Sequence, residues 1–417
     1  MANLEIKGGK SLCGEIKVQG AKNSVLPLLA ATVLCDGKST LHNCPRLSDV
    51  DICMKILGSL KIDCERQGES IVVNNNGCYG NLIPDCLMRL LRSSVVFLGA
   101  ILARSKKAVI SSPGGCDLGP RPIDLHISAL KRLGAKVSEQ HGQIVFEAPD
   151  GLVGSEINLS FASVGATENI ILAAVLARGV TVINNAAREP EICDLAEFLN
   201  KCGAKIKGAG TNTVTICGAK SLKGCEHTVI PDRIVAATFM AAAAVTGGNI
   251  KLKGVNCSHL ASTLGVFSAA GCSIKYKNNN LWICSPQKLQ AVPIVETLVY
   301  PGFPTDAGPI VVSMLSVSSG TSVLVENIFE NRFKYIDELR RFGAKITTVG
   351  KVAIIEGTDK LMAAPCCCTD LRGAAAIVIA ALSAKGKTII SKTHHIMRGY
   401  EDIADSLSTL GADVKWC

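Results

Sequence analysis

The loop SSPGGCDLGPRPIDLH at residues 111–126 contains the residues best suited to chemistry. Cys116 follows a Pro-Gly-Gly turn, and glycine lets a ligand approach the backbone closely. Proline suits the first helical position, so we expect a helix to begin at Pro122 with Arg121 at its boundary. A helix N-terminus favours anions, and positive charge favours a thiolate, so Cys116 is a candidate acid–base group. A capping loop with a bystander thiol fits the same residues equally well.

Further charged and polar residues stand where turns enter apolar helices. Taken singly, each acidic residue is more typical of a helix N-cap and each basic one of a solvated surface charge. Several such helix ends facing one cleft would instead attract anions strongly. The residues in such positions, together with the arginine of MRGYE, are Lys22, Asn23, Arg92, Asp306, Asp370, Arg372 and Arg398.

A motif that recurs six times defines the elements that must position these residues. Its clearest copies read LKRLGAKV, LNKCGAKI, LRRFGAKI and LSTLGADV, with FSAAGCSI as a looser copy and LGSLKIDC as a degraded one. The glycine position, which Lys61 occupies in the degraded copy, recurs at 61, 134, 203, 271, 343 and 411. We interpret this position as the left-handed C-cap of an amphipathic helix that leads into a strand.

Other helices of the repeats are apolar on all sides, as in ATENIILAAVLARG, AATFMAAAAVTGG and AAAIVIAALSAKG. A helix that is apolar on every side must be buried on every side. A chain of 417 residues is also too long for one ordinary core. The sequence therefore predicts more than one α/β domain, with sheets that face solvent around buried helices.

Composition limits the class of protein. Apolar residues make up 48% of the chain, and 44 Lys and Arg against 35 Asp and Glu give a net charge of +9. This excess suits an anionic ligand, but no dense basic tract is present, so we expect no nucleic acid partner. Apolar runs such as 234–245 are too short to span a bilayer, so we expect no membrane insertion.

Some sequence patterns resemble those of disulfide-bonded, metal-binding or nucleotide-binding proteins, but none of them meets the requirements of such a site. Nineteen cysteines without a secretory signal indicate reduced thiols and a cytoplasmic protein. The three neighbouring cysteines at 366–368 cannot easily converge on one ion, so we expect no metal site. The fragments GGKS at 8–11 and DGKST at 36–40 lack the first glycine of a P-loop, and we expect hairpin turns there.

The chain resembles the enolpyruvyl transferase family from end to end, and within it the UDP-N-acetylglucosamine 1-carboxyvinyltransferases. The resemblance rests on GAKNS, PGGCDLGPRPIDLH, SVGATEN, REPEI, PDRI, YPGFPTD, ENIFENRF, TDLR and RGYE. It implies a two-domain inside-out α/β barrel built from six βαβαββ-type repeats. One domain would contain residues 22–230 and the other residues 1–21 plus 231–417, with the active site in the cleft between them.

The resemblance also implies a reaction. The enolpyruvyl group of phosphoenolpyruvate passes to the 3′-hydroxyl of UDP-N-acetylglucosamine with release of phosphate, which is the first committed step of peptidoglycan synthesis. C3 is protonated, the hydroxyl attacks C2, and a tetrahedral ketal collapses. These two small molecules are the implied partners, and no metal or organic cofactor is implied. The epoxide fosfomycin, which mimics phosphoenolpyruvate beside the thiol, is an implied inactivator.

By the same resemblance, Cys116 is the general acid for C3, and Asp306 accepts the proton of the sugar hydroxyl. Lys22, Arg121 and Arg398 would hold phosphoenolpyruvate beside Asn23, while Asp370 and Arg372 complete the catalytic cleft. The remaining residues implied for the nucleotide-sugar site are Arg92, Pro122, Ile123, Asp124, Leu125, Phe161, Ala162, Ser163, Val164 and Ile328.

Three places depart from the family's pattern: Met397, Val235, and the Ala-Gly-Pro segment at 307–309. They leave open a catalytically silent paralogue that binds the nucleotide sugar. The shikimate-pathway enolpyruvyl transferase is a second alternative with the same fold, but it lacks the cysteine loop. RNA 3′-phosphate cyclase has related repeats, yet it needs a histidine nucleophile that has no convincing counterpart among the seven histidines.

Overall fold

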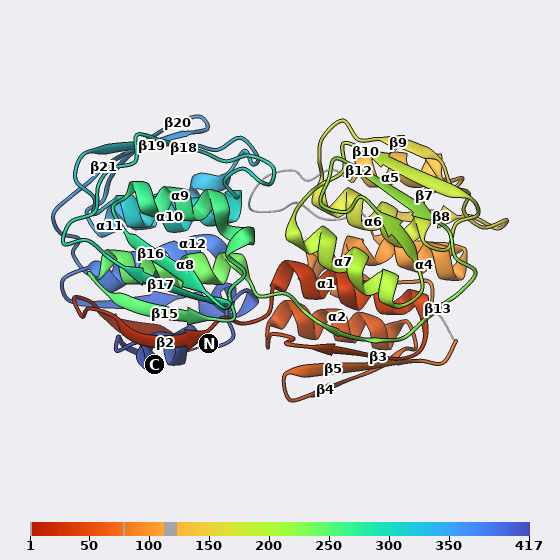
Figure 1. Cartoon of the computed structure of the whole chain (residues 1–417), viewed down its shortest axis with the longest axis horizontal. Coiled ribbons are helices and arrows are strands. Elements are labelled where there is room, and N and C mark those ends of the chain that lie inside the picture. The colour runs from red at the N-terminus through yellow and green to blue at the C-terminus, as the bar shows by residue number, and fades with distance from the viewer. Residues whose placement is uncertain (1, 78–79, 112–122) are drawn as a thin grey trace. The chain divides into compact units, whose positions relative to one another are not determined.

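The computed structural model describes residues 2–77, 80–111 and 123–417, and its fold is mixed α/β (Figure 1). Contacts divide the described chain into two compact units. Unit 1 contains residues 2–19 and 231–417, and unit 2 contains the described residues between 20 and 230. Each unit has a hydrophobic core of its own.

Unit 1 contains three sheets, with the strand orders β22-β23-β1-β24, β16-β17-β15-β2 and β18-β19-β21-β20. Its helices are α8 (Arg233–Val245), α9 (Ala261–Ala269), α10 (Gly308–Leu315), α11 (Ile336–Arg341), α12 (Leu371–Ser383) and α13 (Ile403–Thr409). Its short 3-10 helices are η3 (Cys257–Leu260), η4 (Thr305–Ala307), η5 (Arg332–Tyr335) and η6 (Thr393–Arg398). Its strands are β1 (Leu4–Lys7), β2 (Cys13–Lys17), β15 (Asn249–Lys253), β16 (Ser273–Lys277), β17 (Asn280–Cys284), β18 (Ile294–Glu296), β19 (Thr321–Val325), β20 (Lys345–Val349), β21 (Val352–Glu356), β22 (Cys366–Cys367), β23 (Lys387–Ser391) and β24 (Asp413–Trp416).

Unit 2 also contains three sheets, with the orders β11-β12-β10-β9, β6-β8-β7 and β13-β3-β5-β4, and β14 also pairs with β3. Its helices are α1 (Lys22–Ala31), α2 (Ser48–Ser59), α3 (Asp85–Leu90), α4 (Phe97–Ser105), α5 (Asp124–Arg132), α6 (Val164–Ala174) and α7 (Pro190–Lys201), with η1 (Thr32–Leu34) and η2 (Arg92–Val96). Its strands are β3 (Cys35–His42), β4 (Asp63–Gln67), β5 (Ser70–Asn75), β6 (Lys107–Ser111), β7 (Lys136–Gln140), β8 (Gln143–Glu147), β9 (Glu156–Asn158), β10 (Val180–Asn184), β11 (Lys205–Lys207), β12 (Thr213–Cys217), β13 (Leu222–Lys223) and β14 (Glu226–Thr228).

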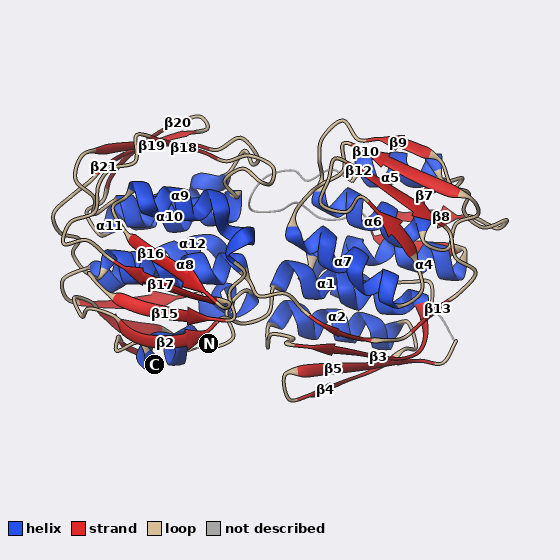
Figure 2. Ribbon diagram, viewed as in Figure 1, coloured by secondary structure: helices blue, strands red, loops and turns tan. Residues whose placement is uncertain are grey.

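The predicted pairing of one buried with one outer helix recurs in all six repeats. The buried helices are α1, α4, α6, α8, α10 and α12, and sheets cover them from outside (Figure 2). The outer helices are α2, α5, α7, α9, α11 and α13. This confirms the predicted architecture of buried helices and outward-facing sheets. In the described part of the chain the six sheets are separate and open, so neither unit contains a closed barrel.

The six predicted C-caps are confirmed by the backbone. The five glycines of the motif have φ between +88° and +108°, and Lys61 has φ +63°. Lys61 therefore adopts the left-handed conformation although it carries a Cβ. The degraded copy of the motif is a repeat of the same structure.

Two expectations about local structure are wrong. Residues 8–11 do not form a hairpin turn, because β1 and β2 on either side belong to different sheets. Residues 36–40 lie inside β3 rather than in a turn.

The helix expected from Pro122 is α5, which begins at Asp124 with Ile123 as its N-cap. None of the helices within the described residues is long and apolar enough to cross a membrane.

We predict that Lys61→Gly raises the free energy of unfolding of unit 2 by about 0.5–1 kcal/mol. Glycine adopts a positive φ without the steric cost of a Cβ, although it also gives the unfolded chain more freedom. Denaturant unfolding followed by circular dichroism measures the change. Gly203→Ala is the matched control, because Gly203 has φ +108° with open space around it, and it should destabilise unit 2. An unchanged or lower midpoint for Lys61→Gly would contradict this account.

Candidate active site

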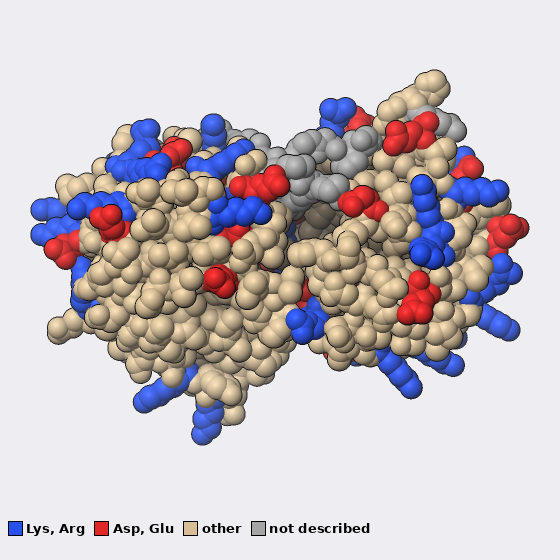
Figure 3. All heavy atoms as spheres, turned by 90° about the horizontal axis from the view of Figure 1, so that it is seen from above, with Lys and Arg blue, Asp and Glu red and all other residues tan. Residues whose placement is uncertain are grey.

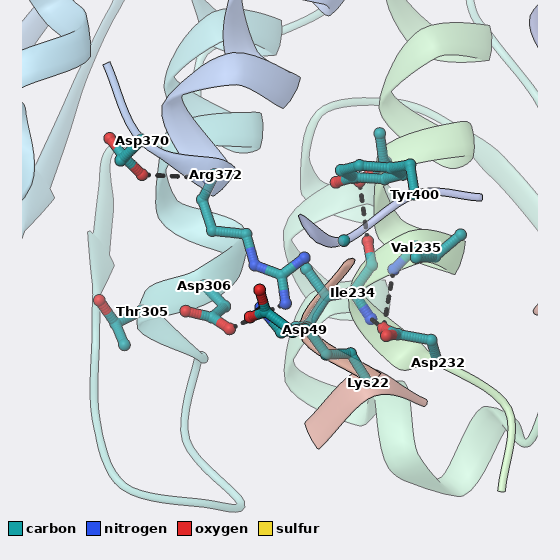
Figure 4. Close-up of polar contacts among 12 residues, drawn as sticks. Lys22, Asp49, Asp232, Ile234, Val235, Thr305, Asp306, Asp370, Arg372 and Tyr400 are labelled. Atoms are coloured by element: carbon teal, nitrogen blue, oxygen red, sulfur yellow. Dashed lines mark hydrogen bonds and ion pairs between the residues drawn. The ribbon is translucent and has the colours of Figure 1, made fainter. Parts of the chain in front are cut away.

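Asp306 in unit 1 lies between two buried arginines. Its Oδ1 accepts a hydrogen bond from Nη2 of Arg332 at 3.1 Å, and its Oδ2 accepts one from Nη2 of Arg372 at 3.0 Å. Figure 4 shows the side chains of Asp306 and Arg372 pointing toward one another. The Asp306 side chain is 27% exposed, whereas both arginine side chains are almost fully buried. The carboxylate therefore sits at an accessible edge of a buried cationic group.

This arrangement sets the charge of the cluster. Burial alone would raise the pKa of Asp306, but the guanidinium groups of Arg372 and Arg332 outweigh it and hold that pKa well below its usual range. Asp306 thus stays ionised across the neutral and mildly acidic range. Two guanidinium groups and one carboxylate leave the cluster with a net positive charge.

Three guanidinium nitrogens of this cluster have no hydrogen-bond partner among the described residues. They are Nε of Arg332 and both Nε and Nη1 of Arg372. A buried charged donor without an acceptor is costly, so such groups are usually satisfied by a ligand or ordered water. The cluster can therefore accept an anionic ligand with several oxygen atoms.

Glu326 holds the segments on which Asp306 and Ile328 stand. This residue, which sequence reasoning missed, is 1% exposed and accepts a hydrogen bond from the hydroxyl of Thr305 at 2.8 Å. Its other carboxylate oxygen accepts from the hydroxyl of Thr297 and from the backbone N–H groups of Ile328 and Phe329. The predicted site residues Asp306 and Ile328 are thus linked through one buried carboxylate.

Asp370 acts in this structure as a helix cap. Its Oδ1 accepts hydrogen bonds from the backbone N–H groups of Arg372 and Gly373 at the start of α12, at 3.0 and 3.1 Å. Asp232 caps α8 in the same way, through Ile234 and Val235 (Figure 4). Both caps place a carboxylate at the N-terminus of a buried helix, as expected for N-cap residues.

Arg398 ends η6 and is half-buried. The turn that follows is held by Gln19, whose side chain donates to the carbonyl of Gly399 and accepts from the N–H of Glu401. A Cβ at Gly399 would overlap the side chain of Leu371, which explains the glycine of RGYE.

The three departures from the family's pattern are compatible with the local structure. Met397 is 43% exposed, so it occupies no core position. Val235 lies buried in the first turn of α8, where its N–H donates to the Asp232 cap. In the 307–309 segment, Pro309 stands at the second position of α10, where proline is well tolerated.

Lys22 in unit 2 stands at the predicted helix entrance and forms a buried ion pair. It is the first residue of α1, with Asn23 beside it, and its Nζ lies 2.7 Å from Oδ2 of Asp49 in the first turn of α2. The two side chains are 8% and 1% exposed. Asp49 was not found from the sequence, because nothing local distinguishes it from an ordinary acidic residue in a first helical turn.

A second buried network anchors the first turn of α1. The hydroxyl of Ser24 donates to Oδ2 of Asp194 on α7, and Nε2 of His227 on β14 lies 2.8 Å from Oδ1 of the same aspartate. Nδ1 of His227 lies 3.2 Å from Nζ of Lys201, which can only donate, so Nε2 carries the proton given to Asp194. This network fixes the helix turn that carries Lys22 and Asn23.

Apart from Ile328, which lies in unit 1, the described residues implied for the nucleotide-sugar site lie on three segments of unit 2. Arg92 is the first residue of η2, directly before α4. Ser163 is the N-cap of α6 and accepts from the N–H of Ala166, and Val164 begins that helix. Next to them, Phe161 is 47% exposed and Ala162 is half-buried. On α5 and its cap, Ile123 and Leu125 are half-buried and Asp124 is exposed.

Asn169 joins these segments, and sequence reasoning missed it. Its Oδ1 accepts from the N–H of Gly99 on α4, and its Nδ2 donates to the carbonyl of Val95 on η2. The same Nδ2 lies 2.9 Å from Nδ1 of His126 on α5. Burial lowers the pKa of His126 to about 4, so its ring is neutral and can accept this hydrogen bond.

Cys116, Arg121 and Pro122 lie outside the described residues. The 17 cysteines that are described are all free thiols. Burial raises the pKa of Cys366 and Cys368 to about 12, which leaves them protonated at neutral pH. Within the described ranges, no group of three or more His, Cys, Asp or Glu is placed to hold a metal ion.

The hollows of the surface do not coincide with the predicted catalytic residues. Figure 3 shows Lys and Arg side chains on the viewed face of each unit, with Asp and Glu side chains among them. A hollow of about 540 Å³ is lined by α7 and residues 206–209, and another of about 180 Å³ lies where α8 and α12 end. Neither hollow is lined by a predicted site residue.

Comparison with known proteins shows the class of protein. Residues 6–407 match the EPSP synthase (3-phosphoshikimate 1-carboxyvinyltransferase) family, so the chain belongs to that family. It is 50% identical over 414 residues to UDP-N-acetylglucosamine 1-carboxyvinyltransferase 2 of Caldanaerobacter subterraneus subsp. tengcongensis, covering 99% of both chains. It is 44% identical over 418 residues to UDP-N-acetylglucosamine 1-carboxyvinyltransferase of Myxococcus xanthus, covering 100% of this chain and 99% of that one.

Solved structures share the fold. The enolpyruvyl transferase NikO from Streptomyces tendae matches with a TM-score of 0.91 at 23% identity, covering 100% of this chain and 98% of that one. EPSP synthase from Acinetobacter baumannii matches with a TM-score of 0.79 at 17% identity over 100% of both chains. These similarities confirm the predicted enolpyruvyl transferase fold.

We predict that Cys116 is alkylated first among the 19 cysteines by a limiting small electrophile at neutral pH. The thiolate is the reactive form, and burial suppresses it at most of the described thiols, including Cys44, Cys64 and Cys272. Peptide mass spectrometry ranks the sites. The exposed Cys13, Cys86, Cys284 and Cys417 serve as internal controls for accessibility alone. Labelling of Cys116 no faster than these four would remove it as the catalytic acid.

Proposed function

We propose that this protein transfers the enolpyruvyl group of phosphoenolpyruvate to the 3′-hydroxyl of UDP-N-acetylglucosamine and releases phosphate. Relatives that carry the corresponding name are 44–50% identical over nearly the whole chain. The observation in the structure that supports the reaction best is the Asp306 cluster, where a partly exposed carboxylate adjoins buried guanidinium donors that have no partner within the described part of the chain. The reaction would be the first committed step of peptidoglycan synthesis.

In this proposal both units serve one active site, with residues 22–230 and residues 1–21 plus 231–417 as the two domains. Lys22, Asn23, Arg121 and Arg398 bind phosphoenolpyruvate, and Asp370 and Arg372 complete the catalytic cleft. The residues at 92, 121–125, 161–164 and 328 bind the nucleotide sugar. The reaction proceeds without a metal or an organic cofactor. A cytoplasmic location is part of the same proposal, and it suits a chain with 19 cysteines, because reducing compartments keep thiols free.

The proposed chemistry is an addition followed by an elimination. Cys116 delivers a proton to C3 of the enol while the sugar hydroxyl attacks C2, and Asp306 takes the proton of that hydroxyl. The tetrahedral ketal then loses a proton from C3 and expels phosphate, which restores the double bond. The C3 proton returns to the Cys116 thiolate, and the hydroxyl proton held by Asp306 leaves with the phosphate. No atom changes its oxidation state overall, so no oxidant or reductant is required.

The two arginines explain how Asp306 could become a base at the right moment. In the free protein their charge lowers the pKa of Asp306, so the carboxylate binds a proton weakly. An anionic substrate would compete for the guanidinium donors of Arg332 and Arg372 and bring negative charge close to the carboxylate. Both effects raise the basicity of Asp306 once phosphoenolpyruvate is bound. In this proposal, the binding of phosphoenolpyruvate makes Asp306 a stronger base for the sugar hydroxyl.

The choice of the substrate that accepts the enolpyruvyl group tests this function. We predict phosphate release from phosphoenolpyruvate with UDP-N-acetylglucosamine, and only background release with shikimate 3-phosphate or with no acceptor. Turnover with shikimate 3-phosphate would instead identify the shikimate-pathway reaction. Binding of the nucleotide sugar without turnover would identify a silent paralogue.

We predict that Asp306→Asn lowers kcat by about 10²-fold or more, since general acid–base assistance is typically worth this much. Phosphoenolpyruvate should bind no more weakly than to the unchanged protein, because Arg332 and Arg372 lose the anion that competes for them. Steady-state kinetics and equilibrium titration measure the two effects separately. Asp337→Asn, which removes an exposed carboxylate paired with Arg340, is the matched control and should leave both unchanged. A normal kcat in Asp306→Asn would contradict the proposed role.

A further inference from the structure

The sheet β16-β17-β15-β2 of unit 1 has an unusual outward surface. Its register places Glu15, Lys251, Trp282 and Lys275 in one row across the four strands. The next row contains Lys17, Lys253, Asn280 and Lys277, while the third row, of Cys13, Asn249, Cys284 and Ser273, is uncharged. We call the outward residues of these two charged rows the lysine face.

The charge of the lysine face is one-sided. It carries five lysines and a single carboxylate, Glu15. Glu15 is already bonded to two of them, Lys251 at 3.3 Å and Lys253. Counted over the residues of these two rows alone, the formal charge is therefore +4. Lys275 and Lys277, on the edge strand β16, are both exposed.

The other five sheets provide an internal comparison, because they are built from the same repeat. Their outward strand residues include at most three lysines and always at least one carboxylate. The sheet of β1, for example, sets Lys7, Lys387 and Lys415 against Glu5 and Asp413. None of these five outward faces has a formal charge above +1. The lysine face is therefore not a consequence of the architecture.

An aromatic side chain stands within the lysine face. Trp282 is 37% exposed, and Nζ of Lys251 lies 5.5 Å from its ring centroid. Tryptophan combines an apolar ring with a polar N–H group, and it is enriched where a protein meets the headgroup level of a membrane.

We propose that the lysine face binds an anionic phospholipid surface through its headgroup phosphates, with Trp282 entering the interfacial layer. Lysine is a mobile point charge, so five lysines on one face of a sheet suit phosphates that can move laterally to meet them. No arginine is present on this face, which disfavours the bidentate contacts typical of specific nucleic acid or phosphopeptide recognition. The binding is peripheral and separate from the residues assigned to the transferase reaction.

Vesicle sedimentation of the full chain tests this proposal. We expect binding to phosphatidylcholine vesicles that contain phosphatidylglycerol, little binding to phosphatidylcholine alone, and release at about 1 M salt, where the Debye length is about 3 Å. Lys275→Glu with Lys277→Glu should weaken binding by at least about 25-fold, since each basic residue near such a surface contributes about fivefold. Circular dichroism and the thermal midpoint verify that the variant is folded. Lys275→Gln with Lys277→Gln removes the two charges without reversing them and should weaken binding less.

The matched control is Lys205→Glu with Lys207→Glu on β11, the edge strand that follows the cap Gly203 as β16 follows Gly271. It makes the same charge change on another repeat and should not alter vesicle binding. Equal losses in both double variants would show a net-charge effect and overturn the proposal, as would binding to a single-stranded oligonucleotide but not to the vesicles.

Tryptophan fluorescence tests whether Trp282 itself contacts the vesicle surface. The chain has two tryptophans, so Trp416→Phe leaves Trp282 as the only one. Its fluorescence emission should shift to shorter wavelength with the anionic vesicles and stay unchanged with phosphatidylcholine alone. Binding without a shift would place the contact elsewhere and overturn the proposal.

Discussion

The burial of six apolar helices is the constraint on which the rest of this structure depends. Each buried helix has backbone N–H groups in its first turn that no carbonyl of the helix can satisfy. Ser163, Asp232 and Asp370 satisfy them at α6, α8 and α12 through side-chain caps. The starts of α1, η2 and α10 have no side-chain cap, and Lys22, Arg92 and Asp306 stand at or next to them. These predicted site residues therefore lie at equivalent places in the repeats, at or near the N-termini of buried helices.

The cluster around Asp306 buries charged side chains next to the start of the buried helix α10. Arg332 and Arg372 can be nearly inaccessible because Asp306 compensates them, although one carboxylate cannot balance two guanidinium groups. The remaining positive charge and the unpartnered nitrogens make an anion the favourable addition.

The sequence predicted those parts of the structure that depend on local pattern. The repeat, the buried helices and the left-handed caps, including Lys61, each follow from residues within one or two helical turns. It also predicted helix entrances at Lys22 and Asp306. It did not reveal Asp49 or Arg332, because their partners are 27 and 26 residues away and only the tertiary fold brings them together. The hairpins expected at 8–11 and 36–40 failed for a related reason, since glycine indicates a turn or an irregular strand but not which strands pair.

The buried carboxylates that hold the site were the hardest to find. Glu326 and Asp194 are nearly inaccessible, yet each accepts hydrogen bonds from two or more segments. Glu326 begins the motif ENIFENRF, but that motif does not indicate which segments the carboxylate joins, and Asp194 has no such signal. The burial and the hydrogen bonds of the two carboxylates show their structural task. The six repeats share one architecture, so a residue without a counterpart in the other repeats indicates a task beyond the fold. Helix entrances and outward sheet faces are two places where packing restricts the residue type less than it does in the core. The charged residues at the helix entrances and the lysine face on β16-β17-β15-β2 lie in these two variable places.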